Sequence, residues 1–153
     1  MNGGIVTLLI LAPNILTLLL PPQGKPQAEP HDKAPRPWEV LERFGQVACF
    51  ALPFFYQFQH RQPFGHPVLI VTALAMALYY AGWARYLLRG RYYPLLFKLL
   101  LAIPLPMAVA PVVCFSGAAI MLRSWPLALA TVIFGLGHIR ISHSEYRQIT
   151  DAV

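Results

Sequence analysis

The sequence predicts an all-α integral membrane protein, a single domain over residues 1–153 with five transmembrane helices. Hydrophobic residues make up 57% of the chain and charged residues only 12%, whereas a soluble domain carries about 25% charged residues. Five apolar stretches each approach the ~20 residues that a helix needs to cross a hydrocarbon core of about 30 Å. The basic residues also alternate between the ends of these stretches, as the positive-inside rule requires.

The five stretches cover about residues 3–20, 40–58, 67–88, 95–122 and 125–141. The first has no Lys or Arg before it and ends at Pro21 and Pro22, so we expect a retained helix and not a cleaved signal peptide. Residues 21–37 are rich in proline and poor in apolar residues. This composition predicts an extended cytoplasmic loop between the first two helices.

The fourth stretch is too proline-rich for one straight helix. Pro104, Pro106 and Pro111 fall inside it, and each removes a backbone donor and crowds the preceding turn. We therefore expect a kink or an unwound turn between Ile103 and Pro106. An unwound turn at membrane depth needs other protein groups or water to satisfy its backbone, and broken helices of this kind line the ligand sites of some transporters.

The distribution of charge predicts the orientation of the chain. Ten of the twelve basic residues fall on one side of the predicted membrane, namely Lys25, Lys33, Arg36, Arg43, Arg85, Arg89, Arg91, Lys98, Arg140 and Arg147. That side is cytoplasmic by the positive-inside rule, which places the N-terminus outside and the C-terminus in the cytoplasm. All six carboxylates lie on the same side. We therefore expect a multi-pass protein of a bacterial inner membrane or a plasma membrane, with its polar chemistry at the cytoplasmic face.

The second stretch begins with a polar face that descends into the membrane. Glu42, Arg43 and Gln46 follow at helical spacing, and polar side chains at this depth should turn toward the bundle interior. Glu42 is a candidate acid–base residue, while Arg43, Gln46 and Lys98 are candidate ligand-binding residues. Because an isolated carboxylate in this layer is costly, we expect Glu42 to pair with Arg43, Lys98, Arg140 or His138.

The fifth stretch ends with a second group of candidates. His138, Ser142 and Glu145 share one helical face, so the imidazole of His138 could exchange a proton beside the Glu145 carboxylate. Alternatively, this segment is an amphipathic helix end at the lipid headgroups. Asn14 lies within the first stretch, where an Asn typically bonds another helix, and it is also a candidate ligand contact. His and Cys spacing predicts no metal site, and no cofactor motif occurs.

Two further patterns occur in and after the third stretch. Six aromatic residues gather near its cytoplasmic end, namely Tyr79, Tyr80, Trp83, Tyr86, Tyr92 and Tyr93. They are typical of an interfacial aromatic belt, although a cage around a ligand is an alternative. Ala73, Ala77 and Ala81 form a stripe of small residues that favours close helix packing, either within the bundle or in a homo- or hetero-oligomer.

Three functions remain open at this stage. The first is a small membrane protein, enzyme or binding protein, that binds or modifies a lipid-like anionic molecule, held by Arg43 and Lys98 while Glu42 or His138 moves a proton. The second is a non-catalytic partner subunit, and the third is a transporter or channel subunit built around the broken helix. The net charge of +6 is explained by anionic lipid headgroups, so we expect no nucleic-acid partner.

Overall fold

The structure is a computed structural model that describes residues 2–24, 37–59, 65–97 and 106–151. This part of the chain is all-helical, as predicted, and contains no β-strand. The α-helices are α1 (Gly4–Leu19), α2 (Pro37–Ala51), α3 (Gly65–Leu88), α4 (Pro106–Met121) and α5 (Trp125–Asp151). Two short 3-10 helices, η1 (Leu52–Phe55) and η2 (Tyr93–Leu96), follow α2 and α3.

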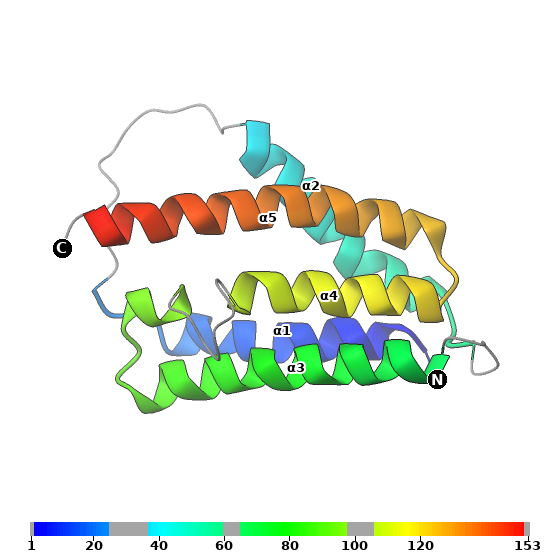
Figure 1. Ribbon diagram of the computed structural model, residues 1–153, viewed down its shortest axis with the longest axis horizontal. Helices are drawn as coiled ribbons and strands as arrows, with labels where there is room; N and C mark the ends of the chain where they lie inside the picture. Colours follow the sequence, from blue (N-terminus) through cyan, green and yellow to red (C-terminus); the bar gives the residue numbers. More distant parts are fainter. Residues whose placement is uncertain (1, 25–36, 60–64, 98–105, 152–153) are drawn as a thin grey trace.

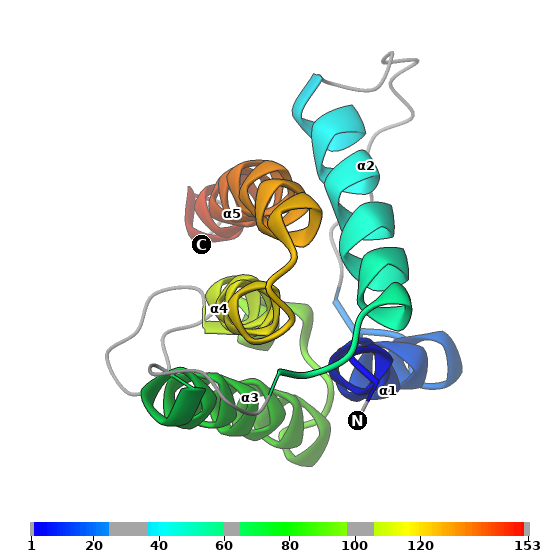
Figure 2. The ribbon, with the colours of Figure 1, turned by 90° about the vertical axis from the view of Figure 1, so that its right-hand side faces the viewer.

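The helices form an elongated bundle in which α3, α4 and α5 lie in a row (Figures 1 and 2). The middle helix of this row, α4, packs against both of the others. Helix α2 runs obliquely across α5 and makes its main contact there (Figure 1). Helix α1 lies beside the row and contacts η1, α2, α3 and α4. The core between these helices is formed mainly by small and aromatic side chains, including Ala110, Cys114, Phe115, Ala118 and Phe134.

The first two predicted helices differ from the observed ones mainly at the end of the second. Helix α1 closely matches the predicted 3–20. Helix α2 begins earlier than predicted, at Pro37, because proline fits the first turn of a helix. It ends at Ala51 and not at residue 58, because Pro53 cannot donate the next helical hydrogen bond, and the chain continues as the 3-10 helix η1.

The predicted fourth helix, 95–122, is divided in the structure. Leu95 and Leu96 belong to the 3-10 helix η2, and α4 begins at Pro106. A start at Pro106 is favourable because the proline has no N–H to leave unsatisfied in the first turn. Pro111 remains inside α4. The expected break between Ile103 and Pro106 falls largely on residues 98–105, which lie outside the described residues.

The fifth helix is longer than predicted and continues to Asp151 instead of ending near residue 141. Its sequence turns polar there without a glycine or proline to end the helix. Within the described residues, two helical segments are long and apolar enough to cross a membrane, Gly65–Leu88 and Trp125–Arg147. Gly4–Thr17 and Pro106–Met121 are shorter apolar helices. Length and composition therefore support two membrane crossings, and they do not confirm five.

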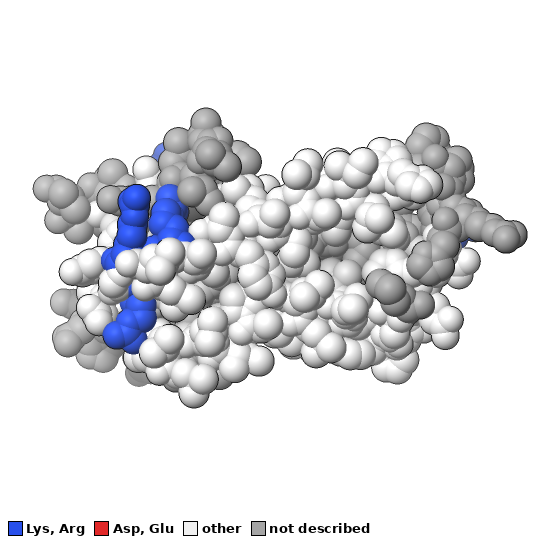
Figure 3. Space-filling view, turned by 90° about the horizontal axis from the view of Figure 1, so that it is seen from below, with Lys and Arg blue, Asp and Glu red and all other residues white. Residues whose placement is uncertain are grey.

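The two ends of the bundle gather the connections that the sequence assigned to opposite sides. At one end, Gln23 after α1 exchanges backbone hydrogen bonds with Arg91 and Tyr93 after α3. At the other end, the N-terminal segment bonds Tyr56, and Gln59 bonds Met121. In the face drawn in Figure 3, most of the visible basic side chains gather at one end, and no Asp or Glu is visible. Basic residues near the end of α3 include Arg85 and Arg89.

Candidate functional site

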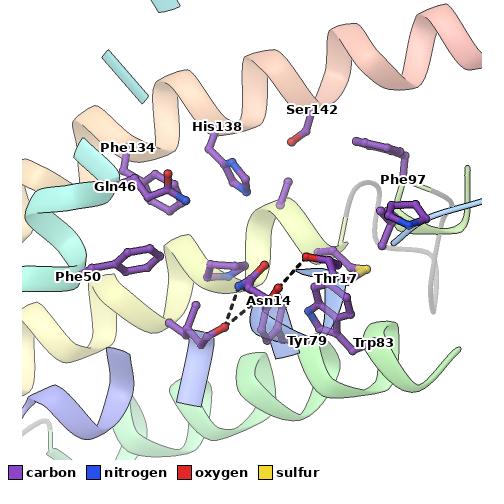
Figure 4. Close-up of a pocket in the computed structure, with 16 residues that line it drawn as sticks. Asn14, Thr17, Gln46, Phe50, Tyr79, Trp83, Phe97, Phe134, His138 and Ser142 are labelled. Carbon is purple, nitrogen blue, oxygen red and sulfur yellow. Dashed lines mark hydrogen bonds between the residues drawn. The ribbon is translucent and has the colours of Figure 1, made fainter. Parts of the chain in front are cut away.

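A cavity of about 420 Å³, open on one side, lies between the helices and is lined by residues of all five. Figure 4 shows its polar side chains, with Asn14 from α1, Gln46 from α2, and His138 and Ser142 from α5. Much of the remaining wall is aromatic, formed by Phe50, Tyr79, Trp83, Phe97 and Phe134. A mostly apolar cavity of 300–1,000 Å³ with a few polar groups is typical of a small-molecule site. We call it the interhelical cavity.

The most reactive group on its wall is His138, which pairs with Glu42, a residue that does not itself line the cavity. His138 Nδ1 lies 2.5 Å from Glu42 Oε1, and the exposed fractions of the two side chains are 25% and 18%. The expectation that Glu42 pairs with one of four named residues is thus confirmed. With Glu42 ionised, the carboxylate can only accept, so Nδ1 is the donor. In a neutral His138, Nε2 then carries a lone pair and can accept a proton from a bound molecule.

Two glycines bring α2 and α5 close enough for this pair to form. A Cβ atom on Gly137 of α5 would lie 2.9 Å from the Cα and N of Glu42. A Cβ on Gly45 of α2 would lie 2.7 Å from the Cα of Phe134. Each glycine therefore lets its helix contact the backbone of the other. The His138 ring is also stacked on the Phe134 ring, with centroids 4.7 Å apart, which restricts its orientation.

On the opposite wall, Asn14 joins α1 to α3. Its Nδ2 donates to the Tyr79 hydroxyl at 2.7 Å and to the Ile10 carbonyl at 2.8 Å. The expectation that Asn14 bonds another helix is confirmed. Because both amide protons are used, only the Asn14 carbonyl oxygen remains for a bound molecule. Asn14 could therefore contact a ligand as an acceptor.

Two other polar side chains on the wall are available to a ligand. The side chains of Gln46 and Ser142 make no hydrogen bond to the described residues. The Trp83 indole N–H is buried near the Tyr79 hydroxyl, but the two groups do not reach ordinary hydrogen-bond geometry. Buried polar groups are normally paired. The wall thus offers at least one donor and several acceptors to a molecule that enters the cavity.

Glu145 does not take the role predicted for it. We expected its carboxylate to lie beside His138, but it accepts a hydrogen bond of 2.8 Å from the Tyr93 hydroxyl, and Glu42 pairs with His138 instead. The spacing on α5 correctly indicated that a carboxylate lies near His138. It could not indicate that this carboxylate comes from α2. Burial of Tyr93 and the adjacent Glu145 carboxylate both raise the pKa of the Tyr93 hydroxyl. The Tyr93–Glu145 contact thus ties η2 to α5 as a neutral donor bonded to a carboxylate.

The two cations expected to hold an anionic head group are not on the described wall. Arg43 is exposed and does not line the cavity, because its position on α2 is turned away from α5. Lys98 lies outside the described residues. Among the described lining residues there is no Lys or Arg. Within the described residues there is also no group of three or more potential metal ligands.

The six aromatic residues predicted to form a belt in and after α3 divide into two sets. Four of them are buried, which is incompatible with a purely interfacial belt, namely Tyr79, Trp83, Tyr86 and Tyr93, whereas Tyr80 and Tyr92 are exposed. Tyr79 and Trp83 line the interhelical cavity, as the alternative of a cage around a ligand would require. The alanine stripe of α3 is exposed, so it does not pack inside the bundle; its members are Ala73, Ala77 and Ala81.

Several residues of the site were missed at the sequence level. Phe50, Phe97 and Phe134 could not be distinguished from ordinary lipid-facing or core residues. Gly45 and Gly137 each lie next to a polar candidate in the sequence, which was an available signal for close helix packing. No protein-family model, curated protein or solved structure matches this chain.

Proposed function

We propose that this protein binds a lipid-like molecule in the interhelical cavity of a membrane-embedded bundle and exchanges a proton with its head group through His138 and Glu42. The observation that carries the proposal is the convergence of Asn14, Gln46 and His138, from three different helices, on one aromatic-walled cavity. A structural role alone would explain each residue separately, but it would not require them to line the same space.

The surface of the bundle supports the membrane environment. Large apolar side chains are exposed along its helices, among them Leu8 and Ile15 of α1, Ile70 and Leu74 of α3, and Leu136 of α5. Soluble monomers rarely expose such extended apolar surface. We propose that all five helices lie in the bilayer in the orientation predicted from charge. Helix α1, with 16 residues, is about 24 Å long and would require local thinning of the bilayer.

The composition of the wall favours a head group with a hydroxyl over a fully ionised one. The described wall has no Lys or Arg, and the Glu42 carboxylate pairs with His138 beside it. Among the described residues, an anion placed here would lie near that carboxylate and would meet no Lys or Arg on the wall. A hydroxyl can instead donate to His138 Nε2 while its oxygen accepts from the Gln46 amide. Loss of the proton to His138 would place an imidazolium between the ligand and Glu42, which stabilises the cation.

The position of the cavity favours a binding site over a transport path. Its lining residues on α5 extend from Phe134 to Ser142, about 12 Å of helix. On α3 they are Tyr79 and Trp83, in the half of the helix that is cytoplasmic in the predicted orientation. A path across the membrane would need lining residues in both halves of these helices.

The proposal is tested by identifying what the protein retains. The full chain is purified in mild detergent, extracted with organic solvent, and the extract is examined by mass spectrometry. We expect a lipid-like molecule bearing a hydroxyl in a fixed ratio to protein. Replacement of the cavity residue Ala108 by Leu should displace it, because Ala108 is 5% exposed and lines the cavity.

Two further variants make this test specific. Ala73→Leu is the matched control, since Ala73 lies on the exposed face of α3 and should leave the bound molecule in place. Glu42→Gln should alter retention without changing the cavity volume. Wild-type protein that folds but carries no stoichiometric small molecule, or an Ala108→Leu protein that keeps it, would overturn the proposal.

A second candidate function, a non-catalytic partner subunit, is favoured by one observation. The alanine stripe is exposed on α3, and only 17% of the most apolar window of this helix is buried in the bundle. Small residues allow close helix approach in membranes. If this function is right, Ala77→Leu should dissociate a complex that is seen by crosslinking in native membranes, and Ala108→Leu should not.

A further inference from the structure

A second depression on the bundle differs in character from the interhelical cavity. It has a volume of about 610 Å³ and lies along the outer side of α4 and α5, with Trp38 of α2 at one end. We call it the α4–α5 groove. Its lining residues on α5 extend from Thr131 to His143, about 18 Å of helix. The groove is therefore long enough to hold an extended hydrocarbon chain.

The walls of the groove are mostly apolar, and the hydroxyl groups of its two hydroxyl residues are already hydrogen-bonded. Val112, Val132 and Leu136 line it directly. The Ser116 hydroxyl donates to the Val112 carbonyl at 2.8 Å, and the Thr131 hydroxyl donates to the Leu127 carbonyl at 2.7 Å. Both hydroxyls are thus bonded to their own helices. The groove consequently offers hydrocarbon contact along this part of its length.

One end of the groove is basic. Arg140 and His143 line it there, and the Arg140 guanidinium lies over the Trp38 ring, 4.8 Å from its centroid. Stacking fixes the plane of the guanidinium but leaves its N–H donors available. Glu39 and Glu145 line an adjoining depression. Among the described residues, however, no carboxylate lies within 4.0 Å of Arg140.

We propose that the α4–α5 groove binds one anionic phospholipid, with an acyl chain along Val132, Leu136 and Ile139 and its phosphate on Arg140. This occupant is selected because the groove is apolar with a basic end, and a phospholipid has an apolar chain with an acidic head group. In the predicted orientation the basic end lies at the cytoplasmic surface, where anionic headgroups and basic side chains meet. The groove is separate from the interhelical cavity, so this inference does not depend on the proposed function.

Native mass spectrometry of the full chain in detergent tests the inference. Phosphatidylglycerol and phosphatidylcholine with identical acyl chains are added separately at equal concentration, and the lipid-bound fraction is measured. For wild-type protein, we expect one bound phosphatidylglycerol molecule to be retained about fivefold more than one phosphatidylcholine molecule. This ratio is the effect expected of one basic side chain on the binding of an anionic lipid. Arg140→Gln should reduce this preference to near unity.

Matched variants separate the groove from general surface charge. Arg43→Gln removes the same charge from an exposed position outside the groove and should keep the preference. Val132→Trp fills the groove from an exposed position and should reduce retention of both lipids, which also tests the site if Arg140→Gln fails to fold. Equal retention of the two lipids by wild-type protein, an unchanged preference in Arg140→Gln, or undiminished retention of both lipids by Val132→Trp would overturn the inference.

Discussion

Pro13 shows at the scale of single residues how the bundle satisfies its backbone. It lies inside α1 and has no N–H, so the Leu9 carbonyl one turn earlier has no partner within the helix. The Tyr80 hydroxyl of α3 donates to that carbonyl at 2.8 Å. In a bilayer no water would replace this donor. Tyr80, which the sequence placed in an interfacial belt, thus pairs a carbonyl freed by a proline.

This pairing predicts a coupled effect of two substitutions. Tyr80→Phe leaves the Leu9 carbonyl unsatisfied and should lower the free energy of unfolding by about 1–2 kcal/mol. In a Pro13→Ala background the residue at position 13 supplies its own N–H, so the same substitution should cost little. Unfolding in mixed detergent micelles measures both. Tyr92→Phe, at an exposed position, is the matched control; an equal loss in both backgrounds would show that Tyr80 acts in some other way.

The sequence predicted which polar side chains form contacts between helices, but it did not always identify the partner residue. Asn14 was expected to bond another helix, and it bonds Tyr79. Glu42 was expected to have one of four partners, and His138 is the observed one. Glu145 was assigned to the wrong group, because spacing along one helix says nothing about which other helix approaches it. Costs of burying polar groups can be read from sequence, whereas the partner depends on how the helices pack.

At the scale of helices, the contact between α2 and α5 depends on glycine. Gly137→Ala would place a Cβ 2.8 Å from the Cβ of Glu42 and 2.9 Å from its backbone, which cannot move without shifting α2. Overpacking of this kind costs about 1–3 kcal/mol, against a gain of about 1 kcal/mol in helix propensity. We expect a net loss of up to about 2 kcal/mol in unfolding free energy and weaker retention of the cavity ligand.

Gly135→Ala is the internal control for that prediction, because it makes the same change two residues away. Its Cβ would meet a Val112 side-chain methyl at 3.0 Å, and a side chain can adjust where a backbone cannot. Its helix-propensity gain should therefore offset most of the cost and leave stability nearly unchanged. Unfolding in the same micelles compares the two variants directly; a larger loss for Gly135→Ala would contradict the assignment of Gly137 as the closer contact.

The limits of the helices follow similar logic. Proline predicted that the stretch from 95 to 122 is not one regular helix, and α4 indeed begins at Pro106. Hydropathy alone placed the end of the fifth helix near residue 141, although α5 continues to Asp151. An apolar run indicates which residues are buried in lipid or protein. A helix can continue beyond such a run where the following polar residues have high helix propensity. Helix ends at Pro53 and Pro106 are readable from sequence, and an end without a breaker is not.

On the scale of the whole molecule, the connections expected on opposite sides of the membrane lie at opposite ends of the bundle. Gln59 bonds Met121 at one end, and Gln23 bonds Arg91 at the other. In a bundle of helices that alternate in direction, the connections at one end must lie close to one another. The charge distribution, with Arg123 at one end and Arg85, Arg89 and Arg91 at the other, predicts that the second end would face the cytoplasm in the proposed membrane topology.

Cysteine labelling in whole cells tests this orientation. The native Cys49 and Cys114 are buried, each 0% exposed, so an impermeant thiol reagent should give a low background. A cysteine at Gln59 or His66, both exposed positions, should react from outside the cell, because that end carries few basic residues. A cysteine at Arg147 should react only after the membrane is permeabilised. The reverse pattern would invert the proposed topology and place the His138–Glu42 pair in the outer half of the membrane, while labelling of both positions from outside would contradict a membrane-spanning bundle.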